Sequence, residues 1–129
     1  MVSPSSLTIR AFGSLLFRFS NGVSLKPPNS FTLHDFQAYC PNELALAVIA
    51  ELDDLTIGGP INGYGIEVSS HIYSLISDTV VAYEIILTDG QLVRATKDRE
   101  YSDLFCAIPW SQGTLGLLVA AKIKLIPIK

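Results

Sequence analysis

Glycines gather in two short segments of this chain, and these segments carry its clearest chemical signal. Four of the nine glycines fall within eight positions, at Gly58, Gly59, Gly63 and Gly65. A Thr-Ile-Gly-Gly turn at the start of a helix presents unpaired backbone N–H groups, which favour a phosphate group. The segment matches neither the Gly-Lys-Ser/Thr loop nor the Gly-x-Gly-x-x-Gly fingerprint. It therefore indicates either a nucleotide-binding loop of another kind or an ordinary tight turn.

Polar side chains follow this first glycine segment at once. Ser69, Ser70, His71 and Tyr73 supply hydroxyl groups, an imidazole and a phenol that can hydrogen-bond an anion or a heteroaromatic ring. No second histidine or cysteine stands near His71 at ligand spacing, so we expect a structural or cofactor-contacting histidine and no metal site. A serine beside a histidine is not a catalytic triad, and the sequence identifies no catalytic residue.

The second glycine segment runs from Pro109 to Gly116 and includes Gly113. Taken alone, it is typical of a loop whose glycines adopt positive φ angles. Two such segments in one small unit can each offer backbone donors to a different part of one long ligand. We therefore expect the segments around Ile57 and around Gln112 to converge and to line a single elongated groove.

Four strands are expected to position these segments. Residues 46–50 are apolar and favour a short buried strand, although a short helix fits the same pattern. Residues 79–88 and 91–96 are rich in β-branched and aromatic side chains and flank Asp89-Gly90, which predicts a β-hairpin. Residues 117–126 end in the alternation of a strand with one wet face.

Short helices complete the expected fold. Asp54 or Thr56 can cap a helix that begins at the first glycine segment. Ser102 can cap a second helix that continues to Ile108 and ends before Pro109. The fold class predicted is α+β, with a mainly antiparallel sheet and short helices.

The composition of the chain limits the classes of function that it can have. The chain has 129 residues, enough for one domain or for part of a larger one, and too few for a complete large cofactor enzyme. Its net charge of −3 disfavours a nucleic-acid partner, since such domains are usually strongly basic. No stretch approaches the roughly 18 apolar residues of a membrane span. Cys40 and Cys106 are too few for a disulfide framework and fit no zinc pattern.

Charge divides the chain into two parts. Residues 1–34 contain three basic side chains and no acid, whereas residues 35–129 contain six basic and twelve acidic ones. The beginning is rich in serine and arginine, which is typical of an organellar transit peptide, although an unrelated leader fits equally well. We therefore assign residues 1–41 to a leader or linker of unknown structure, and residues 42–129 to the folded unit.

Five segments together resemble the delta(24)-sterol reductase family, most closely its plant, brassinosteroid-biosynthesis form. The segments are residues 51–59 (ELDDLTIGG), 61–67 (INGYGIE), 69–73 (SSHIY), 82–87 (AYEIIL) and 107–121 (AIPWSQGTLGLLVAA). The resemblance extends over residues 42–127. It implies the second half of an FAD-binding domain of the vanillyl-alcohol-oxidase, or PCMH, type.

The resemblance also implies a reaction and a set of cofactor contacts. In this family NADPH reduces FAD by hydride transfer, and the flavin passes the hydride to the side-chain double bond of a sterol. The family is associated with the endoplasmic reticulum membrane, and an organelle or the cytoplasm stays open for this chain. Matched by position, the FAD contacts would be Thr56, Gly58, Gly59, Gly63, Gly65, Ser69, Ser70, His71, Gly113, Thr114, Gly116 and Val119.

Three positions depart from the family pattern. Pro60 replaces a bulky aliphatic residue, and a proline inside a helix removes a donor and clashes with an earlier carbonyl. Val68 and Ser74 stand where glycines are usual. If these two sites need a positive φ angle, we expect strain at both of them, and more at the β-branched valine.

The family's first FAD half and its substrate domain are not recognisable in this sequence. We therefore expect that the isolated chain does not reduce sterols with NADPH. The alternative hypothesis is a truncated, non-enzymatic remnant or interaction module, with an exposed apolar surface that favours association. A third hypothesis, a free-standing phosphate binder, predicts binding of ADP without a flavin.

Overall fold

The computed structural model describes residues 6–10, 15–19, 22–26, 43–49, 51, 58–63 and 65–128. Its described strands form a five-stranded sheet and a separate two-stranded sheet, and every pairing is antiparallel. The larger sheet has the order β1-β7-β5-β6, with β4 also paired to β7. The strands are β1 (Ser6–Arg10), β2 (Leu15–Phe19), β3 (Gly22–Lys26), β4 (Leu44–Leu46), β5 (Val80–Ile86), β6 (Leu92–Thr96) and β7 (Leu117–Pro127).

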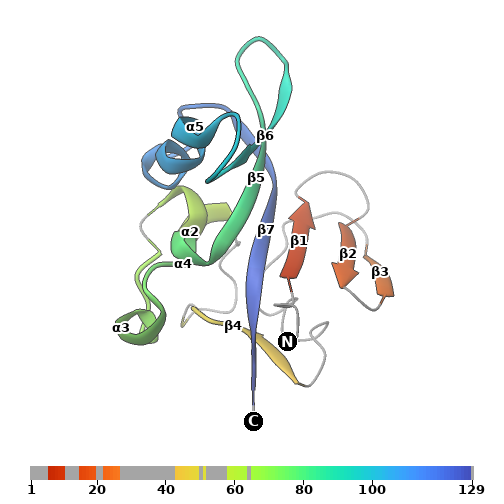
Figure 1. Ribbon diagram of the computed structural model, residues 1–129, viewed down its shortest axis with the longest axis vertical. Coiled ribbons are helices and arrows are strands. Elements are labelled where there is room, and N and C mark those ends of the chain that lie inside the picture. The colour runs from red at the N-terminus through yellow and green to blue at the C-terminus, as the bar shows by residue number, and fades with distance from the viewer. Residues whose placement is uncertain are drawn as a thin grey trace.

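Short helices lie on one side of the long strands. In Figure 1 they stand to the left of β5 and β7, whereas β1 and the β2–β3 hairpin stand to the right. The helices are α2 (Gly58–Asn62), α3 (Ser70–Tyr73), α4 (Ile76–Thr79), α5 (Ser102–Ala107) and the 3-10 turn η1 (Ile108–Trp110). The predicted α+β class, with a mainly antiparallel sheet, is confirmed.

The predicted hairpin is present as β5 and β6, with Ile86 opposite Leu92. A three-residue loop, 88–90, joins them: the Leu87 N–H donates to the Gln91 carbonyl, and the Gly90 N–H donates to the Leu87 carbonyl, each at 2.9 Å. Gly90 has a φ of 84°, which glycine adopts without strain. The Asp89 carboxylate accepts the Gln91 N–H at 2.9 Å and fixes the turn.

The last predicted strand is also present, as β7. Its alternation is the expected one, since Ala121, Ile123 and Leu125 are buried and Lys124 between the last two is exposed. β7 pairs with β5 through residues 117–123 and with β1 through residues 120–124. It is therefore the strand around which the described sheet is built.

The strand expected at residues 46–50 is wrong in its extent. β4 covers Leu44–Leu46, and Ala47 and Val48 are buried in a bend that follows it. The reason is the pairing of β7, whose two edges are occupied by β5 and β1 up to residues 123 and 124. β4 can therefore pair only with residues 125–127, which gives it three residues.

The expected cap of α5 is also wrong. Ser102 is the first residue of α5, the residue before the helix is Tyr101 with a φ of 67°, and no side chain caps this end. α5 ends at Ala107 rather than Ile108, and the chain continues into η1 with Pro109 inside it. A proline near the start of a 3-10 turn is tolerated because its missing N–H would have no acceptor within the turn.

The core lies between the sheet and the helices. Tyr83 of β5 is fully buried, and its ring centre lies 5.0 Å from that of Phe105 in α5. Ile85, Val93 and Ile123 from three adjacent strands join the same buried cluster. These contacts fix α5 and η1 over β5 and β6, and so they fix the start of the second glycine segment.

The three departures from the family pattern have different outcomes. Pro60 is the third residue of the one-turn helix α2, where an N–H has no acceptor within the helix, so no helical hydrogen bond is lost. Val68 has no positive φ, and the strain expected there is absent. Ser74 has φ 65° and ψ −151°, a region that is essentially reserved for glycine.

Candidate functional site

The two glycine segments touch each other in the structure. The backbone N–H of Gln112 donates to the carbonyl of Asn62, the last residue of α2, at 3.2 Å. The Asn62 side-chain amide donates to the Gly58 carbonyl at 3.1 Å, and the Gly63 N–H donates to the Gly59 carbonyl at 2.8 Å. These bonds hold the single turn of α2 closed and place it beside the chain that leaves η1. The described part of the first segment therefore contacts the second one. Ile57 itself lies outside the described residues, and the elongated groove expected between the two segments stays a prediction.

Neither a positive φ nor a close contact with the described residues requires a glycine at position 58. A Cβ atom added there would meet nothing within 4 Å, and its φ lies outside the left-handed range. Gly58 is the first residue of α2, and glycine is used where a backbone approaches a ligand closely, so the open side of Gly58 has room for a close neighbour. A ligand lying against the α2 backbone would supply that neighbour.

Two other predicted contact glycines are required by the fold. Gly65 has a φ of 52°, and a Cβ there would lie 2.8 Å from the Pro60 carbonyl oxygen. At Gly116 a Cβ would collide with the Ile86 carbonyl oxygen of β5. Their presence is therefore explained by packing, whether or not a cofactor touches them.

The polar residues after the first segment lie on and before α3. The Ser70 hydroxyl accepts the Glu67 N–H at 2.9 Å, so it already has a partner. The exposed His71 ring places Nδ1 2.7 Å from the Val68 carbonyl, which can only accept, so Nδ1 carries the proton and Nε2 of the neutral ring is an acceptor. The Ser69 hydroxyl is buried and has no partner among the described residues.

The remaining predicted contacts are divided between the second segment and β7. Gly113 has a φ of 78°, and a Cβ there would meet nothing within 4 Å. Thr114 is exposed, and its hydroxyl donates to the Ser111 carbonyl at 2.6 Å. Val119 lies half-buried on β7, and Thr56 lies outside the described residues.

In the structure, α2 contacts the second glycine segment more closely than α3 does. α2 packs on η1 and on α4, and α3 packs on α4. In Figure 1, α3 stands at the lower end of this row, away from α5. The contact between segments thus joins Gly58–Asn62 to Gln112, and the Ser69–His71 group lies farther along.

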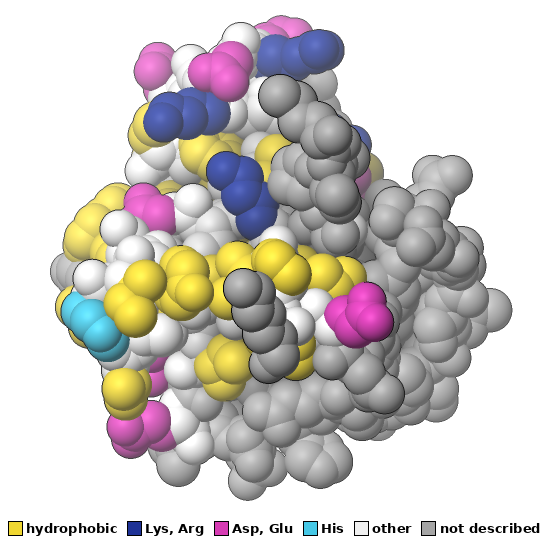
Figure 2. All heavy atoms as spheres, turned by 60° about the horizontal axis from the view of Figure 1, so that its bottom comes forward, with side chains coloured by type: hydrophobic (Ala, Val, Ile, Leu, Met, Phe, Trp, Pro, Cys, Tyr) yellow, Lys and Arg dark blue, Asp and Glu magenta, His cyan; other side chains and the backbone are white. Residues whose placement is uncertain are grey.

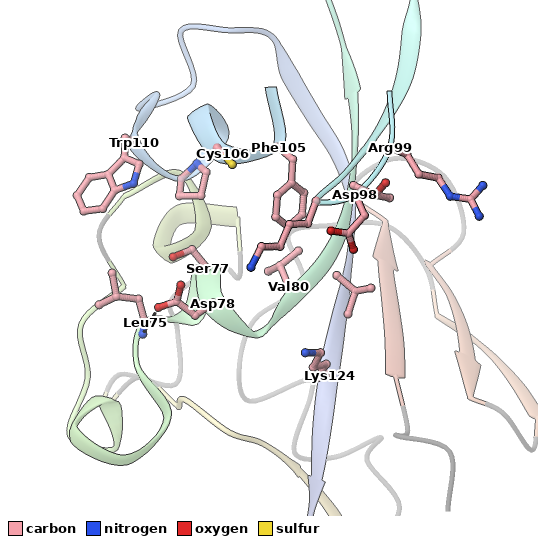
Figure 3. Close-up of a pocket in the computed structure, with 14 residues that line it drawn as sticks. Leu75, Ser77, Asp78, Val80, Asp98, Arg99, Phe105, Cys106, Trp110 and Lys124 are labelled. Carbon is pink, nitrogen blue, oxygen red and sulfur yellow. Dashed lines mark hydrogen bonds between the residues drawn. The ribbon is translucent and has the colours of Figure 1, made fainter. Parts of the chain in front are cut away.

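A hollow elsewhere in the described structure is not formed by the predicted contacts. A pocket of about 580 Å³ lies among α4, the start of β5, the chain after β6, and α5 with η1 (Figure 3). None of the twelve predicted contact residues lines it. No sequence motif predicted this pocket, because its residues come from separate segments, such as Asp78, Lys97, Phe105 and Lys124.

Ionisable groups of the described chain contribute little unusual chemistry. Burial, and then the nearby Asp78 carboxylate, raise the pKa of the Tyr83 phenol far above its ordinary value. Within the described residues, no group of three His, Cys, Asp or Glu side chains could hold a metal ion.

Among the same residues, no helix has the length and apolar character needed to cross a bilayer.

Sequence comparison decides which family this geometry belongs to. Residues 30–96 match the family described as FAD binding domain. The chain belongs to the FAD binding domain family. It is 81% identical over 89 residues to the Delta(24)-sterol reductase of Pisum sativum, an alignment that covers 69% of this chain and 16% of the pea protein. The resemblance read from the five segments is thereby confirmed.

Two further relatives with the same name are also similar to part of this chain. The Delta(24)-sterol reductase of Arabidopsis thaliana is 72% identical over 93 residues, covering 72% of this chain and 17% of that protein. The Homo sapiens Delta(24)-sterol reductase is 60% identical over 84 residues, covering 65% of this chain and 16% of that protein. The chain therefore spans about a sixth of the length of these relatives.

Two observations fit the FAD that the family name implies. The α2 backbone at Gly58 is open to a close neighbour, and the buried Ser69 hydroxyl lacks a partner that a cofactor oxygen or nitrogen would supply. Both lie within or just after the first glycine segment of this FAD binding domain.

Proposed function

We propose that this chain contributes an FAD-binding surface to a delta(24)-sterol reductase. The observation that carries the proposal is the 3.2 Å bond from the Gln112 N–H to the Asn62 carbonyl, which joins the two glycine segments. Since the segments lie side by side, their backbones can face one long ligand. The match to the FAD binding domain family supplies the identity of that ligand.

The residues of this chain would bind and orient the cofactor. Gly58 and Gly113 would let backbone approach it closely, because a Cβ at either position meets nothing within 4 Å in the chain itself. Ser69 would donate or accept a hydrogen bond through its unpartnered hydroxyl. Bound FAD would supply the hydride chemistry, while the protein supplies position and electrostatics.

We extend the proposal to the whole enzyme. NADPH would be the hydride donor, and a sterol with a side-chain double bond would be the acceptor, in plant brassinosteroid biosynthesis at the endoplasmic reticulum membrane. The support is the name shared by the relatives, two of which are from plants. The isolated chain is expected to bind FAD more weakly than the whole enzyme and to show no sterol reduction, because the segments described here offer only part of the cofactor's contacts.

A second candidate is an interaction module that associates through apolar surface. Ile66, Val68 and Ile72, on and beside α3, are 69%, 68% and 66% exposed. Figure 2 shows hydrophobic side chains gathered on the face that includes the lower end of Figure 1. Exposed apolar patches of this kind favour association. Light scattering of the isolated chain distinguishes a monomer from such an assembly.

Titration with FAD tests the first proposal. Flavin fluorescence is followed while purified chain is added, with riboflavin and ADP in parallel titrations. Saturable quenching of FAD at a lower concentration than riboflavin supports a surface that contacts both the flavin and the phosphates. Absence of quenching, in chain shown by circular dichroism to be folded, contradicts it.

A further inference from the structure

A second pocket, of about 590 Å³, adjoins the one in Figure 3, with which it shares Thr96 and Arg99 as lining residues. Its volume lies within the range of roughly 300–1,000 Å³ found for small-molecule sites. β6 supplies Arg94 and Thr96, and the turn between β6 and α5 supplies Arg99, Glu100 and Tyr101. None of the twelve predicted FAD contacts lines this pocket, so a ligand in it is additional to the cofactor.

Two arginines line this pocket, and neither has an ion-pair partner in the described part of the chain. Arg94 and Arg99 are exposed, and each presents a planar guanidinium group with five N–H donors. Figure 3 shows the Arg99 guanidinium turned away from the Asp98 carboxylate, which points into the other pocket. Glu84 lies opposite Arg94 in the sheet, but it is engaged in another interaction. Both guanidinium groups can therefore take an anion from outside the chain.

The charge of this pocket differs from that of the chain as a whole. Glu100 is the one acidic side chain among its lining residues, against two arginines. The whole chain has a net charge of −3, so this surface is a local exception. A locally positive surface raises the concentration of anions beside it.

Thr96 supplies a third polar group. It shares a face of β6 with Arg94, because side chains alternate along a strand and Val93 and Ala95 are buried on the other face. The Oγ1 atom of Thr96 is buried and has no hydrogen-bond partner among the described residues. Buried hydroxyl groups are nearly always hydrogen-bonded in folded proteins. This hydroxyl group therefore indicates a partner that the described chain does not contain.

The turn that carries Arg99 ends in a strained residue. Tyr101 has a φ of 67°, a left-handed conformation that aromatic residues rarely adopt. Its side chain packs against the buried core, which holds the backbone in this conformation. Residues held in this way gather at ligand-binding positions. The core thus fixes the turn in the shape that brings Arg99 to the same pocket as Arg94.

We propose that this pocket binds a small dicarboxylate, held by the guanidinium groups of Arg94 and Arg99 and by a hydrogen bond from the Thr96 hydroxyl. A carboxylate fits a guanidinium group because its two oxygens accept a pair of N–H groups in one plane. Two guanidinium groups offer more donors than one carboxylate can accept, so a ligand with two carboxylates uses the site more fully. The proposal goes beyond the FAD-binding function and does not depend on it.

Isothermal titration calorimetry of the full chain with succinate tests this proposal. Succinamide, which has the same carbon skeleton without the charges, and inorganic phosphate are separate probes. Arg94→Gln removes one charge from the pocket, and Lys124→Gln removes one from β7, outside this pocket. We expect saturable binding of succinate, roughly tenfold weaker in Arg94→Gln and unchanged in Lys124→Gln. Succinamide should not bind, and phosphate should bind more weakly than succinate.

A second variant tests the hydroxyl contact. Thr96→Val keeps the shape of the side chain and breaks no hydrogen bond of the described fold, and we expect a loss of roughly threefold to tenfold in succinate affinity. An unchanged affinity in Thr96→Val excludes this contact.

Other outcomes overturn the proposal as a whole. The absence of succinate binding, in chain shown by circular dichroism to be folded, excludes the site. An equal loss in Arg94→Gln and Lys124→Gln reduces the effect to general charge. Phosphate binding as tight as that of succinate excludes a site specific for carboxylates, and equal binding of succinamide excludes the guanidinium contacts.

Discussion

The backbone N–H of Gln112 and the carbonyl of Asn62 are joined by a hydrogen bond of 3.2 Å. The bond matters because each residue belongs to a segment that carries glycines, and neither segment alone distinguishes a binding loop from a turn. Gln112 itself has a φ of 52°, so the chain leaves η1 in a left-handed conformation to reach α2.

Gly58→Ala is predicted to weaken FAD binding without weakening the fold. The added methyl group meets nothing within 4 Å in the chain, and alanine is a better helix former than glycine, so the unfolding temperature should stay the same or rise. A cofactor against this backbone would be displaced, with a loss of about tenfold in affinity, or ~1.4 kcal/mol. Gly90→Ala is the matched control: its φ of 84° makes alanine destabilising there, while FAD affinity should not change. An unchanged FAD affinity in Gly58→Ala contradicts the contact.

Ser69→Ala is predicted to lower FAD affinity and to leave stability unchanged. Its hydroxyl is buried and has no partner among the described residues, so removing it breaks no hydrogen bond of the described fold. A bond to the cofactor is worth about 0.5–1.5 kcal/mol, which corresponds to roughly 2–13-fold in the dissociation constant. Tyr83→Phe removes another buried, unpartnered hydroxyl, away from the glycine segments and from both pockets, and serves as the control. Equal FAD affinities for the two variants would exclude a specific role for Ser69.

Ser74→Gly is predicted to stabilise the chain by ~1 kcal/mol. Ser74 has φ 65° and ψ −151°, which strains any residue with a Cβ, and glycine relieves that strain at some cost in chain entropy. Ser77→Gly, in the ordinary helical turn of α4, should instead lose about 0.5 kcal/mol. Urea unfolding of the two variants measures both effects. A loss of stability in Ser74→Gly would show that the strain is not present in solution.

Stability is predicted to fall in alkaline solution because of Tyr83. Burial raises the pKa of this phenol in the folded chain above the value of about 10 found in unfolded chains. The folded state therefore resists losing this proton, and its stability is complete below pH ~10 and declines above it, by at most about 1.4 kcal/mol per pH unit. Tyr83→Phe should reduce that decline, and it also removes a buried hydroxyl that has no partner. Identical pH profiles for the two proteins would contradict the assignment.

Local patterns were sufficient to predict part of the fold. Asp89-Gly90 between two β-branched runs predicted the β5–β6 hairpin, because the turn requires a positive φ that Gly90 supplies. Alternation predicted β7, because one face of that strand is buried and the other is partly wet. Both signals depend on a few consecutive residues.

Elements that depend on distant partners were not predictable in the same way. β4 ends at Leu46 because β7 has free pairing positions only from residue 125, and no local pattern contains that information. β1 pairs with β7, from which most of the chain separates it in sequence. β1 also lies within the residues assigned to a leader or linker. The absence of a cap at Ser102 follows from the left-handed conformation of Tyr101, which an aromatic residue rarely adopts.

The candidate site was likewise predictable only in part. The junction of the two glycine segments was predicted, because both were visible as glycine clusters and the resemblance assigned both to one cofactor. The pocket near Trp110 was not predicted, because its aromatic and basic side chains come from separate segments and meet only in the folded chain.

The most direct test of the FAD surface is an NMR titration of the isotope-labelled chain with FAD, followed through its backbone amides. We expect the signals of Gly58, Gly59, Gly63 and Gly113 to shift together and to saturate at the same FAD concentration, while those of Asp89 and Gly90 in the distant hairpin do not move. Shifts confined to one glycine segment, or absent from both, would contradict the claim that the two segments form one cofactor surface.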